Sequence, residues 1–347
     1  MAEYLRRTNP QPFVKTREQE TKIGQAIACL REGDDFNDLL TSHLADGCKV
    51  ALLGVPESIG PRANCGRGGS DGGWQAFLTS FLNLQATPAM PVHELLLLGH
   101  VDCDDLMAEA ADLDAADAQD LNRLRELCAQ VDQRVLQVLR PLFDAGYEVI
   151  LIGGGHNNAY PLLTALYESQ KQRCGSVNLD PHADFRPREG RHSGNGFSYA
   201  YMEGALSNYH VVSLHEGKNS ATSLKQMADA GFSYHSIHRL YDMQFVDALE
   251  EVSALAKSWD QPTGIEVDVD AIMQAPASAL NYTGVSMAQG YRFVSRLASL
   301  PQVHYVHLAE AAPARHPAGQ AAGLMASGQL LTELTLAYLF GREQRAL

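Results

Sequence analysis

Asp180, His182 and Asp184 alternate along the segment DPHAD, a spacing that could hold metal ions. On an extended backbone these three side chains point to one side. At roughly 3.3 Å per residue, full extension would spread them over about 13 Å. Paired metal ions lie about 3.5–4 Å apart, so the segment must curl to bind such a pair. Pro181 is consistent with a strand that ends there. The alternative interpretation is that DPHAD is a solvated polar loop that binds no metal.

The segment EVDVD carries a second group of acids. Asp268 and Asp270 share one face of an extended backbone, opposite two valines, and Glu266 lies on the same face one step earlier. Acids on one side of a buried strand are costly unless cations pair with them. The alternative is an edge strand with a wet face, and the apolar flanking residues argue against it.

His156 follows a third apolar segment, in the turn GGGHNN. Glycines let a backbone turn sharply, so His156 is expected at the end of a strand and the start of a helix. Alone this motif is weak, because a glycine-rich turn between a strand and a helix more often binds phosphate or simply turns.

Together the three segments supply four aspartates and two histidines as candidate ligands, without a thiolate. Oxygen ligands with some imidazole suit manganese or a similar ion better than they suit structural zinc. Without metal, these carboxylates would repel one another and several would take up protons. Two divalent ions balance four negative charges, and this balance predicts two ions instead of one.

The elements that must position these segments alternate between apolar strands and helices. We expect strands over residues 49–56, 94–101, 147–154, 175–180, 209–214, 232–237, 263–269 and 303–309. We expect helices over residues 17–31, 35–45, from 74, up to 144, and over 156–170, 221–230, 242–258, 286–299 and 322–340. This alternation predicts an α/β fold with a mostly parallel sheet covered on both faces. Ligands in such folds gather beyond the carboxyl ends of the strands.

Composition narrows the class of partner. The formal net charge is -14, from 27 basic and 41 acidic residues, without a basic cluster, so nucleic acid and anionic membrane are not expected partners. The six cysteines include no CxxC pair, which indicates reduced thiols and a cytoplasmic location. The first residues lack the apolar stretch of a signal peptide, and no apolar run is long enough to span a bilayer. A small-molecule substrate is expected.

The three segments, in this order, resemble the ureohydrolase family of arginase, agmatinase and formiminoglutamase, with its GGxH, DAHxD and SxDxD motifs. The resemblance runs from about residue 48 to residue 340 and implies a three-layer α/β/α fold. It predicts one α/β domain across residues 1–347, with residues 1–47 as an N-terminal helical extension. It also implies a homo-oligomer, a trimer or a hexamer.

The resemblance implies a binuclear manganese centre, although other divalent ions are possible. Its ligands would be His156, Asp180, His182, Asp184, Asp268 and Asp270. Asp180 and Asp268 would bridge the ions, and Asp184 would also handle protons. Glu310, in LAEAAP, stands where the family has a Glu followed three residues later by Pro, and it would hydrogen-bond the cationic nitrogens of the substrate.

Other pieces match and some depart. Residues 54–69 are similar to the family's GVPxxxGxxxNxGRxG loop, and RHSGNGF is similar to its SGN or SGT substrate loop. Pro181 replaces the usual Ala, and Glu266 replaces Ser. Arginases follow SGN with a Leu-His pair, where this chain has Gly196 and Phe197. These departures spare all six ligands but alter the substrate side, which argues against arginase activity.

Two features favour formiminoglutamase. Arg186 matches the DxR of that group after Asp184, and Phe197 in SGNGF resembles its SGTPF. Arg186 and Asn195 would bind the carboxylate end of the substrate, with Ser193 in the same loop. Equally, Arg186 could support the metal-bound acids from behind. His192 could shuttle protons or be an ordinary loop histidine, and His215 is expected to be a hydrogen-bonded histidine at the edge of the site.

The predicted reaction is hydrolysis of formiminoglutamate to glutamate and formamide. One alternative is an agmatinase- or arginase-type enzyme that releases urea. A second is a catalytically inactive, metal-binding subunit. A single-zinc deacylase is disfavoured because the chain has no His-His pair, and a nucleotide-binding protein is disfavoured because no P-loop lysine follows the glycine runs.

Overall fold

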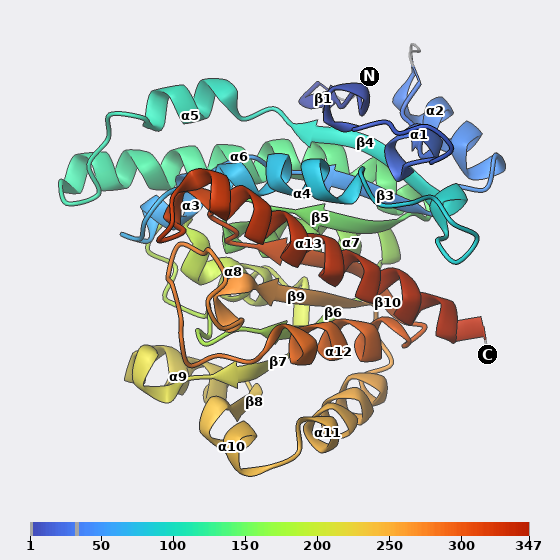
Figure 1. The fold of residues 1–347 in the computed structure, drawn as a ribbon. Coiled ribbons are helices and arrows are strands. Elements are labelled where there is room, and N and C mark those ends of the chain that lie inside the picture. Colours follow the sequence, from blue (N-terminus) through green and yellow to red (C-terminus); the bar gives the residue numbers. More distant parts are fainter. Residues whose placement is uncertain (1–2, 32–34, 347) are drawn as a thin grey trace.

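A single mostly parallel sheet forms the centre of the molecule (Figure 1). The computed structural model describes residues 3–31 and 35–346, and ten strands of this part of the chain join the sheet. In spatial order they are β1 (Leu5–Arg7), β4 (Leu95–Val101), β3 (Val50–Gly54), β5 (Glu148–Ile152), β10 (Val303–Ala309), β9 (Thr263–Asp268), β6 (Cys174–Leu179), β7 (Leu206–Leu214) and β8 (Ser233–Ser236), with β2 (Ala28–Cys29) against β4. Only β1 runs antiparallel to its neighbour among these described strands.

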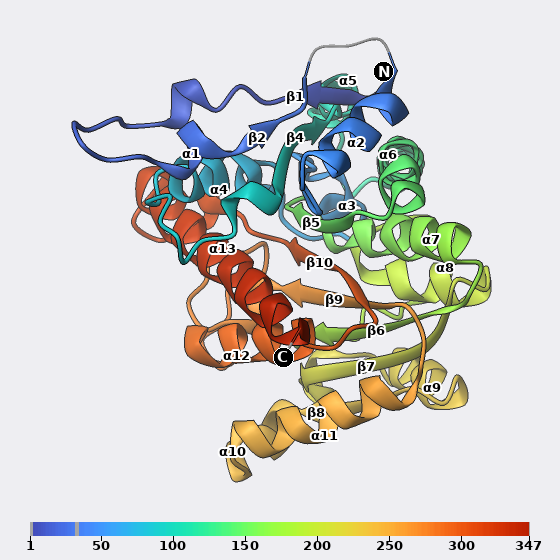
Figure 2. The ribbon, with the colours of Figure 1, turned by 90° about the vertical axis from the view of Figure 1, so that its right-hand side faces the viewer.

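Helices cover both faces of this sheet (Figure 2). One face packs against α4 (Gly73–Phe81), α10 (Ile237–Asp242), α11 (Phe245–Ser258), α12 (Met287–Ala298) and α13 (Gln320–Glu343). The other face packs against α2 (Phe36–Ala45), α3 (Ile59–Ala63), α5 (Asp104–Ala110), α6 (Ala118–Ala145), α7 (Ala159–Gln170), α8 (Gly196–Met202) and α9 (Ala221–Asp229). The expected three-layer α/β/α fold is confirmed.

The central strands are rich in apolar residues because both of their faces are buried. In β3, Val50 and Leu52 pack into one hydrophobic cluster, whereas Ala51 and Leu53 pack into the other. Successive side chains on a strand point to opposite faces, so one short apolar run supplies both cores. This explains why the positions of the central strands can be read from apolar runs.

Local signals set the bounds of the long helix α6. The carboxylate of Asp117 accepts hydrogen bonds from the backbone N–H groups of Gln119 and Asp120 at its first turn. Gly146, at a φ of 91°, ends the helix in the left-handed conformation that favours glycine.

The N-terminal region differs from expectation. A helix over residues 17–31 is wrong: α1 spans only Ile23–Ala26, and β2 follows it. The backbone of β2 pairs with Leu96 and Leu97 of β4, so this contact with a distant strand overrides the local helical pattern. The division of the chain into one domain with an N-terminal extension stays a prediction. None of the helices in the described part of the chain has the length and apolarity that a membrane crossing needs.

Candidate metal centre

The turn after β5 places His156. Gly153 and Gly154 adopt φ values of 84° and 71°, which reverse the chain at the end of the strand. The backbone N–H of Gly155 then donates to Glu57 (2.6 Å), and that of His156 donates to Glu310 (3.0 Å). Two buried acids thus hold this turn, and the His156 side chain is completely buried.

The DPHAD segment curls as its spacing required. Strand β6 ends at Leu179, and the carboxylate of Asp180 accepts a hydrogen bond from the backbone N–H of His182 (2.6 Å). The side chain of Asn219 stabilises the curl by accepting from the N–H of Ala183 (2.8 Å). Asp184 has a φ of 43°, a left-handed conformation that an aspartate tolerates better than most residues.

A similar bend follows β9. The carboxylate of Asp268, the last residue of the strand, accepts a hydrogen bond from the backbone N–H of Asp270 (2.9 Å). This tight turn keeps both aspartates on the same side, while Val267 and Val269 remain buried in the core. The alternative of a wet edge strand is wrong, because β9 lies between β10 and β6.

The structure brings all six predicted ligands together in two overlapping sets. The first set contains His156, Asp180, Asp184 and Asp268, and the second contains Asp180, His182, Asp268 and Asp270. Within each set, one ligand atom from every residue lies within 4.8 Å of the others. Asp180 and Asp268 belong to both sets, so the arrangement provides two adjoining sites with two shared carboxylates.

The chemistry of this cluster fits divalent ions. Nδ1 of His156 lies 3.0 Å from Asp184 and 3.2 Å from Asp180, yet it forms no hydrogen bond with any described residue. Short contacts without hydrogen-bond geometry are expected where ligand atoms face a common ion. Burial, and then the neighbouring Asp270 and Asp180, raise the pKa of Asp268 well above its usual range. Without cations its charged form is therefore unfavourable.

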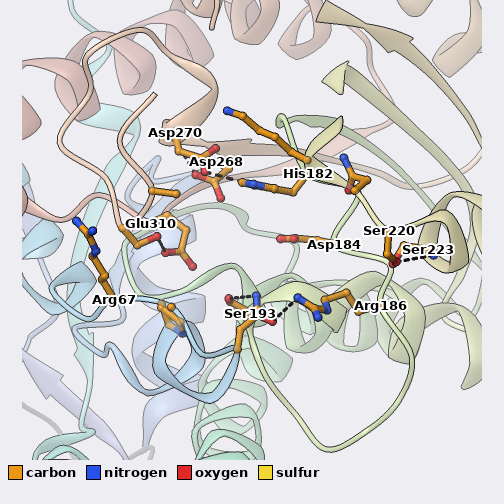
Figure 3. Close-up of a pocket in the computed structure, with 17 residues that line it drawn as sticks. Arg67, His182, Asp184, Arg186, Ser193, Ser220, Ser223, Asp268, Asp270 and Glu310 are labelled. Atoms are coloured by element: carbon orange, nitrogen blue, oxygen red, sulfur yellow. Dashed lines mark hydrogen bonds and ion pairs between the residues drawn. The ribbon is translucent and has the colours of Figure 1, made fainter. Parts of the chain in front are cut away.

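Next to these sets is a cavity of about 300 Å³. Figure 3 shows Asp268, Asp270 and His182 on one side of it, Arg67, Ser193 and Arg186 on the other, and Glu310 and Asp184 between them. Lys218 also lines the cavity. The cavity therefore combines an acidic side with a basic side. His156 and Asp180 lie behind its wall.

Glu310 is buried and still reaches the cavity. One carboxylate oxygen accepts from the backbone N–H of His156, and the other accepts from the Ser278 hydroxyl. Burial, chiefly, raises the pKa of Glu310 to about 8. Its φ of 65° is unusual for a glutamate, and such strain tends to occur at functional sites.

Not all of the predicted substrate-binding residues line the cavity. Arg186 and Ser193 line the cavity, whereas Asn195 does not. The side-chain carbonyl of Asn195 accepts a hydrogen bond from Arg191, and its side-chain amide donates to the backbone carbonyl of Gly190 (2.8 Å). The side chain is completely buried. The polar groups of Asn195 therefore hold the loop together, and its binding of substrate stays a prediction.

The two other histidines have local roles. His192 is buried outside the cavity lining, and its Nδ1 accepts from the N–H of Gly194 (3.1 Å). Burial, followed by Arg125, lowers the pKa of His192 to about 3, which does not suit a proton shuttle near neutral pH. His215 accepts from the N–H of Gly217 (3.1 Å), as expected of a hydrogen-bonded histidine.

Several cavity residues were not predicted individually. Arg67 lies in the glycine-rich loop that resembles the family motif, so the motif itself is the signal that could have identified it. Asn64 is the Asn of the same motif, whereas Lys218 and Ser278 have no comparable local signal. All three reach the cavity through loops that follow β3, β7 and β9.

Fold and site together define an α/β/α metallohydrolase with two adjoining ligand sets. A sequence profile described as the Arginase family matches residues 48–336. The chain belongs to the arginase family, as the motif resemblance predicted.

Known relatives agree with this membership. A formimidoylglutamase of Chromobacterium violaceum is 26% identical over 271 residues, covering 76% of this chain and 80% of that protein. One from Streptococcus gordonii is 28% identical over 251 residues, covering 69% of this chain and 70% of that protein.

Among solved structures, formimidoylglutamase of Bacillus subtilis matches with a TM-score of 0.73 at 17% identity, covering 95% of this chain and 94% of that one. Trypanosoma cruzi formiminoglutamase with Mn²⁺ matches with a TM-score of 0.69 at 18% identity, covering 92% and 99%. These structural matches establish a shared fold.

Proposed function

We propose that this chain is a manganese-dependent hydrolase that converts formimidoylglutamate and water into glutamate and formamide. The observation that carries the proposal is the polarity of the cavity, which has metal-binding acids on one side and Arg67, Arg186 and Lys218 available to the substrate. The curated relatives named formimidoylglutamase, and the Mn²⁺ in the Trypanosoma cruzi structure, support the same reaction and metal.

The charges of the substrate match those of the cavity. The formimidoyl group is an amidine, which is cationic near neutral pH, and the glutamate part carries two carboxylates. Glu310 would bind the amidinium, and Arg186 would bind a carboxylate by charge-assisted hydrogen bonds. Agmatine has no carboxylate, and the guanidino acid arginine has only one. The basic side of the cavity therefore favours the dicarboxylate.

His156, Asp180, Asp184 and Asp268 would hold one ion, and Asp180, His182, Asp268 and Asp270 would hold the other. Two divalent ions, when bound, would supply a water of lowered pKa and polarise the group under attack. Asp184, which lines the cavity, would accept the proton from the attacking water and deliver it to the departing nitrogen. The C–N bond to glutamate breaks, formamide keeps the water oxygen, and the glutamate nitrogen gains the proton.

Product analysis tests this function. Purified protein loaded with Mn²⁺ is given formimidoylglutamate, arginine, agmatine and guanidinobutyrate in separate assays. We expect formamide and glutamate from the first, with a kcat on the order of 1–10³ s⁻¹, and little urea from the others. Urea without formamide would show a guanidino hydrolase, and no product from any of them would favour an inactive metal-binding subunit.

Replacement of Arg186 tests the binding of the carboxylate. Arg186 is exposed at the cavity and its guanidinium donates to Asn64 (3.3 Å). Arg186→Gln should raise KM for formimidoylglutamate by about tenfold, which corresponds to ~1.4 kcal/mol, with a smaller change in kcat. Arg188→Gln, on the same loop but outside the cavity lining, is the matched control. A KM unchanged in Arg186→Gln would leave Arg186 without a role in binding.

We also propose that the enzyme is a cytoplasmic homo-oligomer, a trimer or a hexamer. All six cysteines are free, which is the expected state in a reducing compartment. The oligomeric state follows from the family resemblance alone.

A further inference from the structure

Behind the metal centre, three polar side chains meet in the core of the sheet. Glu266 lies on β9, and Tyr305 and His307 lie on the adjacent β10, where Glu266 is in register with His307. All three are completely buried. A carboxylate in such a place is costly unless its oxygens have partners, so each oxygen of Glu266 needs an explanation.

Both oxygens of Glu266 have partners. One accepts a hydrogen bond from the Tyr305 hydroxyl (2.7 Å), and the other pairs with Nδ1 of His307 (2.7 Å). The second oxygen also lies 3.4 Å from Nε2 of His156, a buried nitrogen that forms no hydrogen bond with any described residue. The His156 ring is therefore flanked by Glu266 at Nε2 and by Asp180 and Asp184 at Nδ1.

The backbone of β9 makes room for this arrangement. A Cβ atom on Gly264 would lie 2.0 Å from the ring of Tyr305, so only glycine allows the tyrosine to reach Glu266. Two residues beyond Glu266 on β9, Asp268 belongs to both ligand sets. The same face of one strand thus carries the space for the tyrosine, the buried carboxylate and a metal ligand in turn.

The two histidine ligands differ in their support. Among the described residues, both ion pairs of His182 involve its Nδ1, with Asp180 and Asp270, and 32% of its side chain is exposed. His156 is enclosed and contacts a carboxylate at each ring nitrogen. Metal-binding histidines usually donate their second ring nitrogen to a carboxylate or carbonyl, which fixes the tautomer and orientation of the ring.

We propose that Glu266 is a positioning residue that turns Nδ1 of His156 toward Asp180, Asp184 and Asp268, with Tyr305 and His307 holding the carboxylate in place. This inference rests on the proposed metal-dependent function. It implies that Glu266 supports the first ligand set and not the second. Loss of the Glu266 carboxylate should therefore weaken the binding of one ion and leave the other ion bound. A general loss of packing would not affect one ion selectively.

Binding isotherms for Mn²⁺ test the inference. Wild-type protein is expected to bind two ions in equilibrium dialysis with metal analysis. Glu266→Gln keeps the shape of the side chain but places an amide beside His156. We expect this variant to bind one ion about 10–100-fold more weakly, while the affinity for the other ion changes little. Tyr305→Phe removes one hydrogen bond to Glu266 and should weaken the same ion by a smaller factor, about 3–10-fold.

Glu148→Gln is the matched control. Glu148 also accepts a tyrosine hydroxyl, that of Tyr338 (2.6 Å), but it lies at the amino end of β5, away from the metal centre. The Glu148→Gln protein should bind both ions as the wild type does. Circular dichroism and melting temperatures show whether each variant folds; if Glu266→Gln does not, the Tyr305→Phe isotherm decides.

Equal weakening of both ions in Glu266→Gln, or unchanged binding of both, would overturn the positioning role. A wild-type protein that does not bind two ions would instead overturn the proposed function, so the two failures can be distinguished.

Discussion

Asp268→Asn should abolish the binding of both metal ions and lower kcat/KM by at least about a thousandfold. Asp268 contributes to both ligand sets, so its loss reaches each ion. Replacing one carboxylate oxygen by an amide nitrogen removes a negative charge and leaves a single oxygen that can bind a cation. Dialysis against Mn²⁺ with metal analysis, followed by assay of formamide release, measures both effects.

The stability of the same variant should change in opposite directions with and without metal. Burial, Asp270 and Asp180 all make the charged form of Asp268 unfavourable when no cation is present. A neutral amide relieves this, so metal-free Asp268→Asn should melt at or above the temperature of metal-free wild type. Mn²⁺ should raise the wild-type melting temperature by mass action and leave that of the variant nearly unchanged.

Asp270→Asn is the matched control, because Asp270 belongs to the second set alone. It should keep the ion that His156 binds. Two tightly bound ions in Asp268→Asn would be incompatible with shared carboxylates. A metal-free variant that melts well below the metal-free wild type would contradict an unfavourable charge on Asp268.

The convergence of the candidate ligands could be predicted from sequence for a physical reason. His156, Asp180 and Asp268 each lie within four residues of the end of a buried apolar strand. Parallel strands bring those ends to one edge of the sheet, so the side chains meet there although up to 88 positions separate neighbours among the three. The ends of central strands can be located from apolar runs, and candidate metal ligands at those ends can be located with them.

Loop side chains follow a different rule. Asn195 resembles a substrate-binding residue by its motif, but its side-chain carbonyl accepts a hydrogen bond from Arg191. Arg191 in turn pairs with the buried Asp132 on α6 (2.7 Å). That pairing spans 59 positions and has no local signature. Similarly, β2 depends on its pairing with β4, so the local pattern predicted a helix there.

Glu266 illustrates a partial prediction. Its position on the same face as Asp268 is clear from the alternation along the strand. Whether it binds a metal or supports a ligand depends on Tyr305 and His307 of the neighbouring strand. Sequence order does not state which strands are neighbours, so the choice required the fold.

Glu310→Gln should reduce kcat/KM by about 10²–10³-fold while both metal ions remain bound. Burial raises the pKa of Glu310 to about 8, so the charged carboxylate is costly until a cation approaches it. The amidinium of the substrate supplies such a cation, and removal of one partner of a buried charge pair costs about 3–5 kcal/mol. The Gln carbonyl can still accept the N–H of His156, so the turn that carries this ligand should persist.

Ser278→Ala separates the charge of Glu310 from its orientation. Ser278 donates to the second oxygen of Glu310, so its loss leaves the carboxylate in place with one partner fewer. We expect a decrease in kcat/KM of only about 3–10-fold. Steady-state kinetics with formimidoylglutamate, combined with metal analysis of each variant, distinguish the cases. If Glu310→Gln kept near wild-type kcat/KM with both ions bound, the amidinium would have to be recognised by the ligand aspartates alone, because Glu310 is the one carboxylate on the cavity lining that belongs to neither ligand set within the described residues.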